Sequence, residues 1–226
     1  MRTSQHGGAT AGRTFTQQKR RDQLVDCMID VIADLGFARA SVAELARRAG
    51  VSKGVITYHF PAKDDLIGAV IADVLGSMGE YLVPRLWTGE FQCVPERFVA
   101  AYITAWATYY RSHAREVLAL VRIYNGFRDE SGRPHSAFDV RAEDIGNVAQ
   151  VLRRGQEMGR LRSFDPLVMA TVIKAALDDL LIQFVDNPDL DLEAYAAELV
   201  ALFECASRPA ADAPAAATDS AGPMAP

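Results

Sequence analysis

Side chains able to bind a polyanion are concentrated in one short stretch of this sequence, residues 41–63. The stretch is SVAELARRAGVSKGVITYHFPAK, in which two serines each precede a segment with helical apolar spacing and are followed by basic residues. Serine hydroxyls and the free backbone amides at a helix start bind phosphate oxygens, and basic side chains supply the opposite charge. The chemistry favoured here is therefore non-covalent binding of a phosphate backbone.

Charge is distributed unevenly along the chain, in a way that supports a polyanionic partner for the first part only. Residues 1–63 hold ten Lys and Arg against five Asp and Glu, whereas all 226 residues together carry a net charge of −5. A basic segment on an acidic body is typical of a protein that presents one part to a polyanion.

No motif in the sequence predicts catalysis or metal binding. The HExxH, P-loop, GxGxxG and GxSxG signatures are absent, and no ExxH pair could build a di-iron bundle. Cys27, Cys93 and Cys205 are too widely spaced for a disulfide framework or a ligand set. Aspartates recur every four residues at Asp22, Asp26, Asp30 and Asp34, and we expect them to form a solvated helix face. We expect no enzyme, no metal and no cofactor.

The stretch at residues 41–63 has the pattern of two short helices joined by a tight turn. Ser41 can cap the first helix, Gly50 permits the positive φ of the turn, and Ser52 can cap a second helix over about residues 53–60. That helix would bury Val55 or Ile56 together with its last aromatic residue. It would expose Lys53, Gly54, Thr57, Tyr58 and His59. Such a helix-turn-helix places its second helix in the DNA major groove.

In these residues the sequence resembles the TetR family of transcriptional regulators. The resemblance rests on SVAELARRAGVS (41–52) and KGVITYHF (53–60), with Lys63 three residues later. It extends more loosely over about residues 15–206, through GRLRSFDP and AALDDLLIQ. It implies an all-α protein of about nine helices, in which a three-helix DNA-binding domain precedes a helical domain for ligand binding and dimerisation.

The resemblance also implies which residues contact DNA. The phosphate contacts would be made by Ser41, Ser52, His59 and Lys63, and the base-facing positions would be Lys53, Gly54, Val55, Thr57 and Tyr58. Arg48 is a further candidate for a phosphate contact, with a merely solvated side chain as the alternative. His59 has the alternative of a buried structural histidine. Thr57 departs from the family pattern, in which many members carry Tyr, so Tyr58 is a candidate for that role.

Composition and apolar periodicity divide the chain into four parts. We expect a disordered basic arm (1–14), a helix-turn-helix domain (15–62), a ligand-binding and dimerisation domain (63–206) and a disordered Ala/Pro tail (207–226). Arg13, Lys19, Arg20 and Arg21 could reach phosphate or the minor groove. Helices are predicted at about 16–35, 63–82, 95–113, 114–130, 137–160, 165–185 and 191–205, with Pro84 ending the second of these.

Neither a membrane span nor a secretory signal is predicted. Charges interrupt every apolar run before the roughly 18 residues that a span needs, and the N-terminus lacks an apolar segment. We therefore expect a soluble cytoplasmic protein without a membrane partner.

Two of the predicted body helices carry candidate residues for an effector pocket. The aromatic stripe that includes Tyr102, Trp106 and Tyr109 is either ordinary core or, as the resemblance implies, pocket lining. Arg122 and Asn125 interrupt an otherwise apolar helix and need partners, either Asp178, another acid or the anionic end of a ligand. Because Asp178 could equally bind a cation, the class of ligand stays open.

The last two predicted helices are candidates for a dimer seam. One helix-turn-helix binds a single half-site weakly, so specificity normally needs a dimer on a palindrome. The proposed rows are Leu167, Ala170, Ile173, Leu177 and Leu181, and Leu192, Tyr195, Leu199 and Leu202; Asp179 stands where many family members have glycine.

The expected function follows from these features together. It is a sequence-specific regulator, by family default a ligand-responsive repressor, that binds a palindromic operator in double-stranded DNA as a homodimer. Ligand binding would tilt the helix that begins at Lys63 and change the spacing of the two recognition helices. The alternative is a DNA-binding regulator controlled by a protein partner, or an activator, without a small-molecule ligand.

Overall fold

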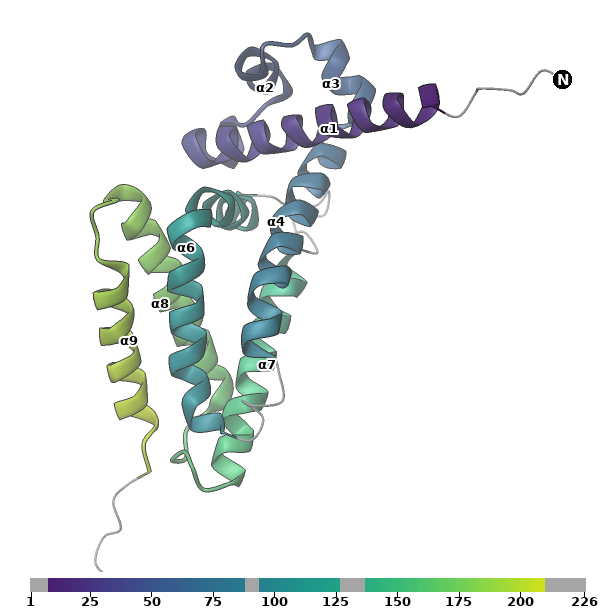
Figure 1. Cartoon of the computed structure of the whole chain (residues 1–226). Helices are drawn as coiled ribbons and strands as arrows, with labels where there is room; N and C mark the ends of the chain where they lie inside the picture. The colour runs from purple at the N-terminus through teal and green to yellow at the C-terminus, as the bar shows by residue number, and fades with distance from the viewer. Residues whose placement is uncertain (1–7, 88–93, 127–136, 210–226) are drawn as a thin grey trace, which may run out of the picture.

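The computed structural model describes residues 8–87, 94–126 and 137–209, and helices make up most of these ranges (Figure 1). The described residues contain no β-strand, which confirms the all-α class. A short 3-10 turn, η1 (Phe37–Arg39), links the first two helices. The α-helices are α1 (Gly8–Leu35), α2 (Val42–Ala49), α3 (Lys53–His59), α4 (Lys63–Leu86), α6 (Pro95–Gly126), α7 (Ala137–Glu157), α8 (Pro166–Asp186) and α9 (Leu192–Ser207).

The helices form a small N-terminal layer on top of an elongated helical body (Figure 1). The helix α1 lies across one end of the body, with α2 and α3 on its outer side, and α4 runs from this layer into the body. Within the body, α6 contacts α4, α7, α8 and α9, and it also contacts α1. The two body helices that meet both layers are therefore α4 and α6.

Local signals set the ends of several helices, and those predicted at Ser41, Gly50 and Ser52 are confirmed. The hydroxyls of Ser41 and Ser52 accept hydrogen bonds from the backbone N–H of Glu44 and Val55. Gly50 ends α2 in the left-handed conformation, with φ 66° and ψ 31°. Asp165 and Asp191 cap α8 and α9, and Gly36 has a positive φ after α1.

Several predicted boundaries are wrong. The helix α1 begins at Gly8, so it includes residues 8–14, which the sequence analysis places in a disordered arm; residues 1–7 and 210–226 lie outside the described part. Pro84 lies inside the last turn of α4 instead of ending the helix. The break predicted between the helices at 95–113 and 114–130 is confirmed, because the backbone leaves the helical conformation at His113 (φ −131°, ψ 24°), and the two segments together carry the label α6. The break predicted at 131–134 lies outside the described residues.

Of the described helices, α4 is the one whose length and composition would allow it to cross a membrane, with 24 residues and a mean hydropathy of 1.6. The sequence predicts no such helix. Leu66, Ile67 and Val70 of its first half are buried in the core, and its second half lines a cavity described below. Packing within the chain thus accounts for part of the apolar character of α4, since 28% of its most apolar window is buried.

Gly50→Ala is expected to destabilise the protein by about 1–2 kcal/mol, because an L-residue in the left-handed conformation carries a steric cost of that size. Gly68→Ala is the matched control, since Gly68 lies within α4 with nothing near its Cβ position. Alanine there should stabilise by about 0.5–1 kcal/mol, because it lowers the entropy of the unfolded chain. Urea unfolding of both variants measures the difference, and equal effects would contradict the assignment of the turn.

Candidate functional site

The recognition helix α3 turns one side into the core and the other toward solvent. Ile56 and Phe60 are buried, whereas 37% of Val55 and 69% of Tyr58 is exposed. The residue that the helix buries is therefore Ile56, which settles the alternative left open by the sequence. The predicted base-facing residues Lys53, Gly54, Val55, Thr57 and Tyr58 are all exposed.

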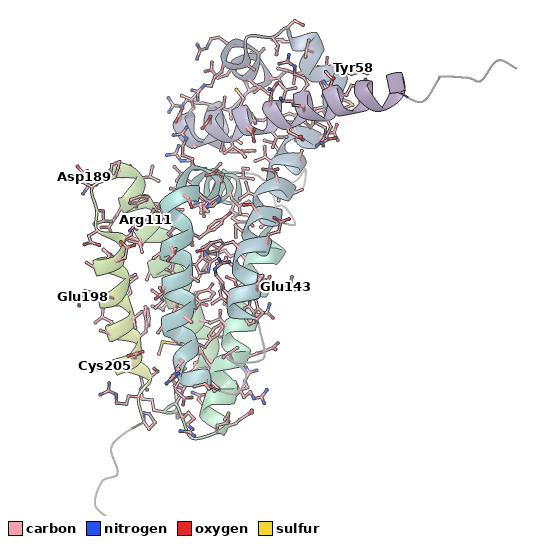
Figure 2. All side chains as sticks on the ribbon, in the orientation of Figure 1. Tyr58, Arg111, Glu143, Asp189, Glu198 and Cys205 are labelled. Atoms are coloured by element: carbon pink, nitrogen blue, oxygen red, sulfur yellow. The ribbon has the colours of Figure 1, made fainter. Side chains whose placement is uncertain are left out.

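Tyr58 is the most prominent side chain on the exposed side of α3. It lies at the end of the molecule away from the body helices (Figure 2). Its hydroxyl accepts a hydrogen bond of 2.9 Å from Nε2 of Gln17 on α1, and its ring meets the ring of His59 edge to face at 5.1 Å. The side chain is therefore positioned by a second helix while its ring stays accessible.

The candidate phosphate ligands surround this helix. Ser41 and Ser52 are exposed, and each hydroxyl that accepts a capping bond keeps its own O–H to donate. His59 is half-buried, so it is not the fully buried structural histidine of the alternative interpretation. Lys63 lies in the first turn of α4, with its Nζ 4.8 Å from the centre of the Phe37 ring.

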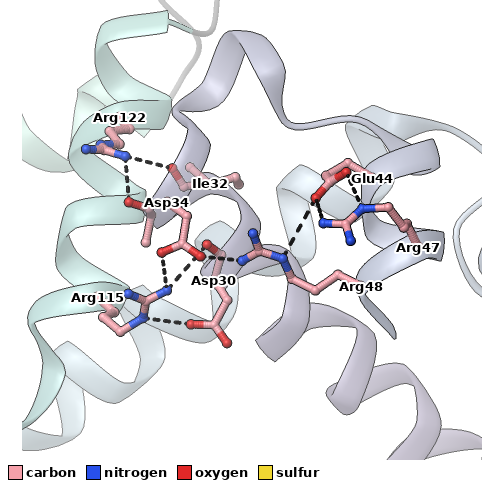
Figure 3. Close-up of polar contacts among 9 residues, drawn as sticks. Asp30, Ile32, Asp34, Glu44, Arg47, Arg48, Arg115 and Arg122 are labelled. Atoms are coloured by element: carbon pink, nitrogen blue, oxygen red, sulfur yellow. Dashed lines mark hydrogen bonds and ion pairs between the residues drawn. The ribbon is translucent and has the colours of Figure 1, made fainter. Parts of the chain in front are cut away.

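Arg48 takes a different position from the one predicted. Its guanidinium forms ion pairs with Asp34 of α1 and Glu44 of α2 (Figure 3). These contacts occupy the side chain within the protein and direct it toward α1. In this structure Arg48 therefore ties α2 to α1, and its phosphate contact stays a prediction.

A network of arginines joins the end of α1 to α6 (Figure 3). Arg115 donates through Nε to Asp30 Oδ1 and through Nη2 to Asp34 Oδ1, both at 2.7 Å. These contacts hold the pKa of the Asp34 carboxyl below its usual value, with the Arg115 hydrogen bond as the largest cause. Two of the aspartates predicted to form a solvated face, Asp30 and Asp34, thus take part in a contact between α1 and α6.

Arg122 completes this junction and corrects a second prediction. Its Nη1 donates to the backbone carbonyls of Ile32 and Ala33, at 3.2 and 2.5 Å. Carbonyls in the last turn of a helix have no partner within that helix, so a cation placed there satisfies them. Arg122 therefore binds the end of α1 and does not line the cavity.

A cavity of about 210 Å³ lies between α4, α6, α7 and α8. Apolar side chains of α4 and α6 form most of its wall, among them Leu75, Leu82, Val117 and Leu120. Its polar end consists of Arg141 and Asp144 from α7 and of Lys174 and Asp178 from α8. An apolar cavity with a few convergent polar groups is the usual form of a small-molecule site.

The residues predicted for the pocket are only partly brought together. Trp106 and Asp178 line the cavity. Tyr102 is buried behind it and donates to Asp144 Oδ2 at 2.6 Å, whereas the Tyr109 hydroxyl pairs with Ser77 at 3.0 Å, away from the lining. Asn125 is exposed near the end of α6 and does not line the cavity.

Three charged lining residues were not predicted from the sequence, namely Arg141, Asp144 and Lys174. Lys174 could have been found from the sequence, since Lys174 and Asp178 are charged residues four apart in a largely apolar helix. Arg141 and Asp144 lie in a helix rich in polar residues, where nothing in the pattern separates a solvated charge from a buried one. Burial raises the pKa of Asp144, although the hydrogen bond from Tyr102 opposes that shift.

Comparison with known proteins identifies the DNA-binding module. Residues 29–70 match the family model of bacterial regulatory proteins of the tetR family. The HTH-type transcriptional regulator BetI of Klebsiella pneumoniae is 39% identical over 70 residues, which cover 31% of this chain and 36% of BetI. BetI 1 of Chromohalobacter salexigens is 38% identical over 69 residues, or 34% of its length. The matched region thus spans about a third of these relatives.

Solved structures resemble the fold over most of the chain. MbdR from Azoarcus sp. CIB has a TM-score of 0.66 at 21% identity and covers 80% of this chain and 95% of its own. AibR, in complex with isovaleryl coenzyme A and operator DNA, has a TM-score of 0.71 at 17% identity and covers 81% and 97%. A regulator from Saccharomonospora viridis in complex with choline has a TM-score of 0.63 at 20% identity and covers 84% and 98%.

The fold and the exposed side of α3 define a helix-turn-helix protein with a helical C-terminal part. More narrowly, this chain carries the DNA-binding module of the TetR family on a TetR-type fold.

Proposed function

We propose that this protein is a sequence-specific transcriptional regulator, a repressor that binds a palindromic operator as a homodimer and releases it when a small molecule binds. The observation that carries the proposal is α3, a capped helix with a buried Ile56 and an exposed side that ends in Tyr58. The relatives matched by this module are transcriptional regulators, which supports a non-enzymatic role in the cytoplasm.

Exposed apolar residues on α8 and α9 support the homodimer. Ala170, Ile173, Leu177 and Leu181, which the sequence analysis assigned to a seam, are buried within the chain's own core. The apolar residues that the two helices present to solvent are Leu167 and Leu202, which belong to the predicted rows, and Val168, Val172 and Ile182, which do not. Two such helices from each copy would form a four-helix bundle with twofold symmetry.

Asp179 belongs to the exposed side of α8. It accepts a hydrogen bond from Gln183, which also donates to the Tyr195 hydroxyl of α9. The carboxylate is thus engaged by a neighbouring amide on the proposed dimer side and is compatible with a seam there.

The cavity supports control by a small molecule over control by a protein partner alone. Among proteins of similar fold, AibR binds isovaleryl coenzyme A, SmeT binds triclosan and the Saccharomonospora viridis regulator binds choline. An effector between α4 and α6 would touch both helices that meet the DNA-binding layer. The dimer would exist in conformations that differ in the distance between its two recognition helices. The effector would favour the conformation that it binds more tightly.

The structure offers two routes from the cavity to the DNA-binding layer. The predicted route is α4, which lines the cavity and leads back to Lys63. The second is the part of α6 after the kink, where Val117 and Leu120 line the cavity and Arg115 and Arg122 hold the end of α1. We propose that both routes transmit the change. The part of α6 after the kink can do so because one of its faces lines the cavity and another contacts α1.

Arg115→Gln is expected to weaken this coupling without removing either ligand or DNA binding. Couplings of this kind are typically about 1–3 kcal/mol, so loss of one route should reduce the ligand-induced drop in operator affinity at least threefold. Arg111→Gln is the control, because Arg111 lies on the same helix but pairs with Glu193 of α9. Operator titrations at zero and saturating effector measure the coupling, and equal values in the wild type and Arg115→Gln would contradict the α6 route.

Capture of genomic DNA by the purified full-length protein, followed by footprinting of the captured sites, tests the proposed function. We expect a palindromic site protected as two half-sites about one or two helical turns apart. Binding that ignores sequence at low ionic strength, or a single protected half-site, would overturn the proposal.

A further inference from the structure

The polar end of the cavity is built around Asp178. Arg141 donates through Nη1 to its Oδ2, and Lys174 donates through Nζ to its Oδ1. Both carboxylate oxygens are therefore already engaged. Lys174 is only 8% exposed, and its Nζ lies 4.6 Å from the centre of the Trp106 ring. The ammonium group is held in place by a carboxylate on one side and an aromatic face on the other.

Hydrogen-bond donors exceed acceptors at this end of the cavity. A guanidinium has five N–H donors and an ammonium has three, and the described contacts of Arg141 and Lys174 to carboxylates use one of each. The buried indole N–H of Trp106 lies near the Tyr102 hydroxyl but makes no hydrogen bond of normal geometry among the described residues. Of the acceptors, Asp144 already receives the Tyr102 hydroxyl on Oδ2. A ligand that complements this site must bring acceptor oxygens.

The charges around Asp144 allow the site to take up an anion. Arg141 on its own helix and Lys174 on α8 lie near it, together with the carboxylate of Asp178 and the hydroxyls of three buried tyrosines of α6, Tyr102, Tyr110 and Tyr124. When Asp144 and Asp178 are both ionised, their two negative charges balance the two positive charges of Arg141 and Lys174. Burial raises the pKa of Asp144, so its protonation is the least costly way to keep this balance when an anion enters.

We propose that the effector is a small apolar carboxylic acid, whose carboxylate binds between Arg141, Lys174 and Trp106 and whose hydrocarbon body lies against α4 and α6. This inference rests on the proposed function, since it names the class of molecule that acts at the same cavity. A cavity of 150 Å³ holds benzene, so about 210 Å³ suits a body of roughly six to ten carbon atoms. An amine of the same length would add donors and a third cation to the site.

Intrinsic fluorescence reports directly on this cavity, because the chain has two tryptophans and both, Trp87 and Trp106, line it. The test titrates the full-length protein with octanoate, 1-octanol and octylamine, which share a chain and differ in the head group. We expect octanoate to bind at least tenfold more tightly than octanol, with octylamine the weakest. The octanoate affinity should fall as the pH rises, because Asp144 takes up a proton when the anion enters and that uptake becomes more costly at higher pH.

Three variants assign the preference to the named residues. Lys174→Met and Arg141→Met should each weaken octanoate binding at least tenfold and leave octanol binding unchanged, so octanol also serves as the control for folding. Asp144→Asn mimics the protonated acid. It should bind octanoate at least as tightly as the wild type and lose the pH dependence.

Several outcomes would overturn the inference: equal binding of octanoate and octanol, tightest binding of octylamine, no response to any of the three probes, or an unchanged head-group preference in Lys174→Met. The same samples are assayed for binding to the captured DNA without a probe. DNA binding that persists when the head-group preference fails shows that only the class of effector is wrong, whereas absence of DNA binding overturns the proposed function itself.

Discussion

Val172→Arg should convert the proposed homodimer into a monomer and lower operator affinity about 100- to 10,000-fold. Half of the Val172 side chain is exposed, within the apolar side of α8. In a twofold interface one substitution places an arginine in both copies, where each would be desolvated without a partner. The large loss at the operator follows because two linked recognition helices gain about 10²–10⁴ in affinity over one.

Sedimentation analysis and operator titrations at matched protein concentrations measure this effect. Met158→Arg is the control, since Met158 is similarly exposed (45%) but follows α7, away from the apolar side of α8 and α9. It should remain dimeric and bind DNA normally. A dimeric Val172→Arg protein would show that the copies associate through another surface.

Tyr58→Ala should weaken operator binding about 30- to 25,000-fold while leaving the fold intact. A side chain that contacts a base or stacks in the groove is worth about 1–3 kcal/mol, and a dimer loses the contact twice. Because 69% of Tyr58 is exposed, its removal creates no cavity and should change the stability of the protein little. Tyr58→Phe keeps the ring and loses only the hydrogen bond from Gln17, so it should fall between the wild type and alanine.

Titration of the captured operator and of a scrambled duplex separates recognition of the base sequence from attraction to the phosphate backbone. The Tyr58→Ala protein should lose the difference between the two duplexes, whereas Lys63→Ala should weaken both alike and reduce the salt dependence by about one ion per subunit. Unchanged discrimination by Tyr58→Ala would remove this residue from the proposed base-facing set.

The helix-turn-helix could be predicted from the sequence because each of its signals is local. A serine hydroxyl caps the helix that starts beside it, a glycine permits the positive φ of its own turn, and Ile56 and Phe60 share a face because they are four residues apart. The same holds for the aspartate caps of α8 and α9.

The cavity and the dimer surface could be predicted only in outline, because both depend on which helices become neighbours. Tyr109 has the same aromatic character as Trp106, yet only Trp106 lines the cavity, since the kink at His113 and the packing of α4 decide which face is covered. On α8, apolar residues lie on both sides of the helix. Burial of Ala170 and Ile173 by the rest of the chain leaves Val172 outside.

By itself, the amino-acid sequence determined the fold class and the helix-turn-helix module, because short-range capping, turn and periodicity rules decide these features. It left open whether α3 buries Val55 or Ile56. The tertiary structure alone decided the partners of the charged side chains. Arg122 binds carbonyls 90 residues away, and Arg141 meets Asp178 from another helix. A charge on a helix must find an opposite charge or a free carbonyl, but its own sequence does not specify which helix will supply it.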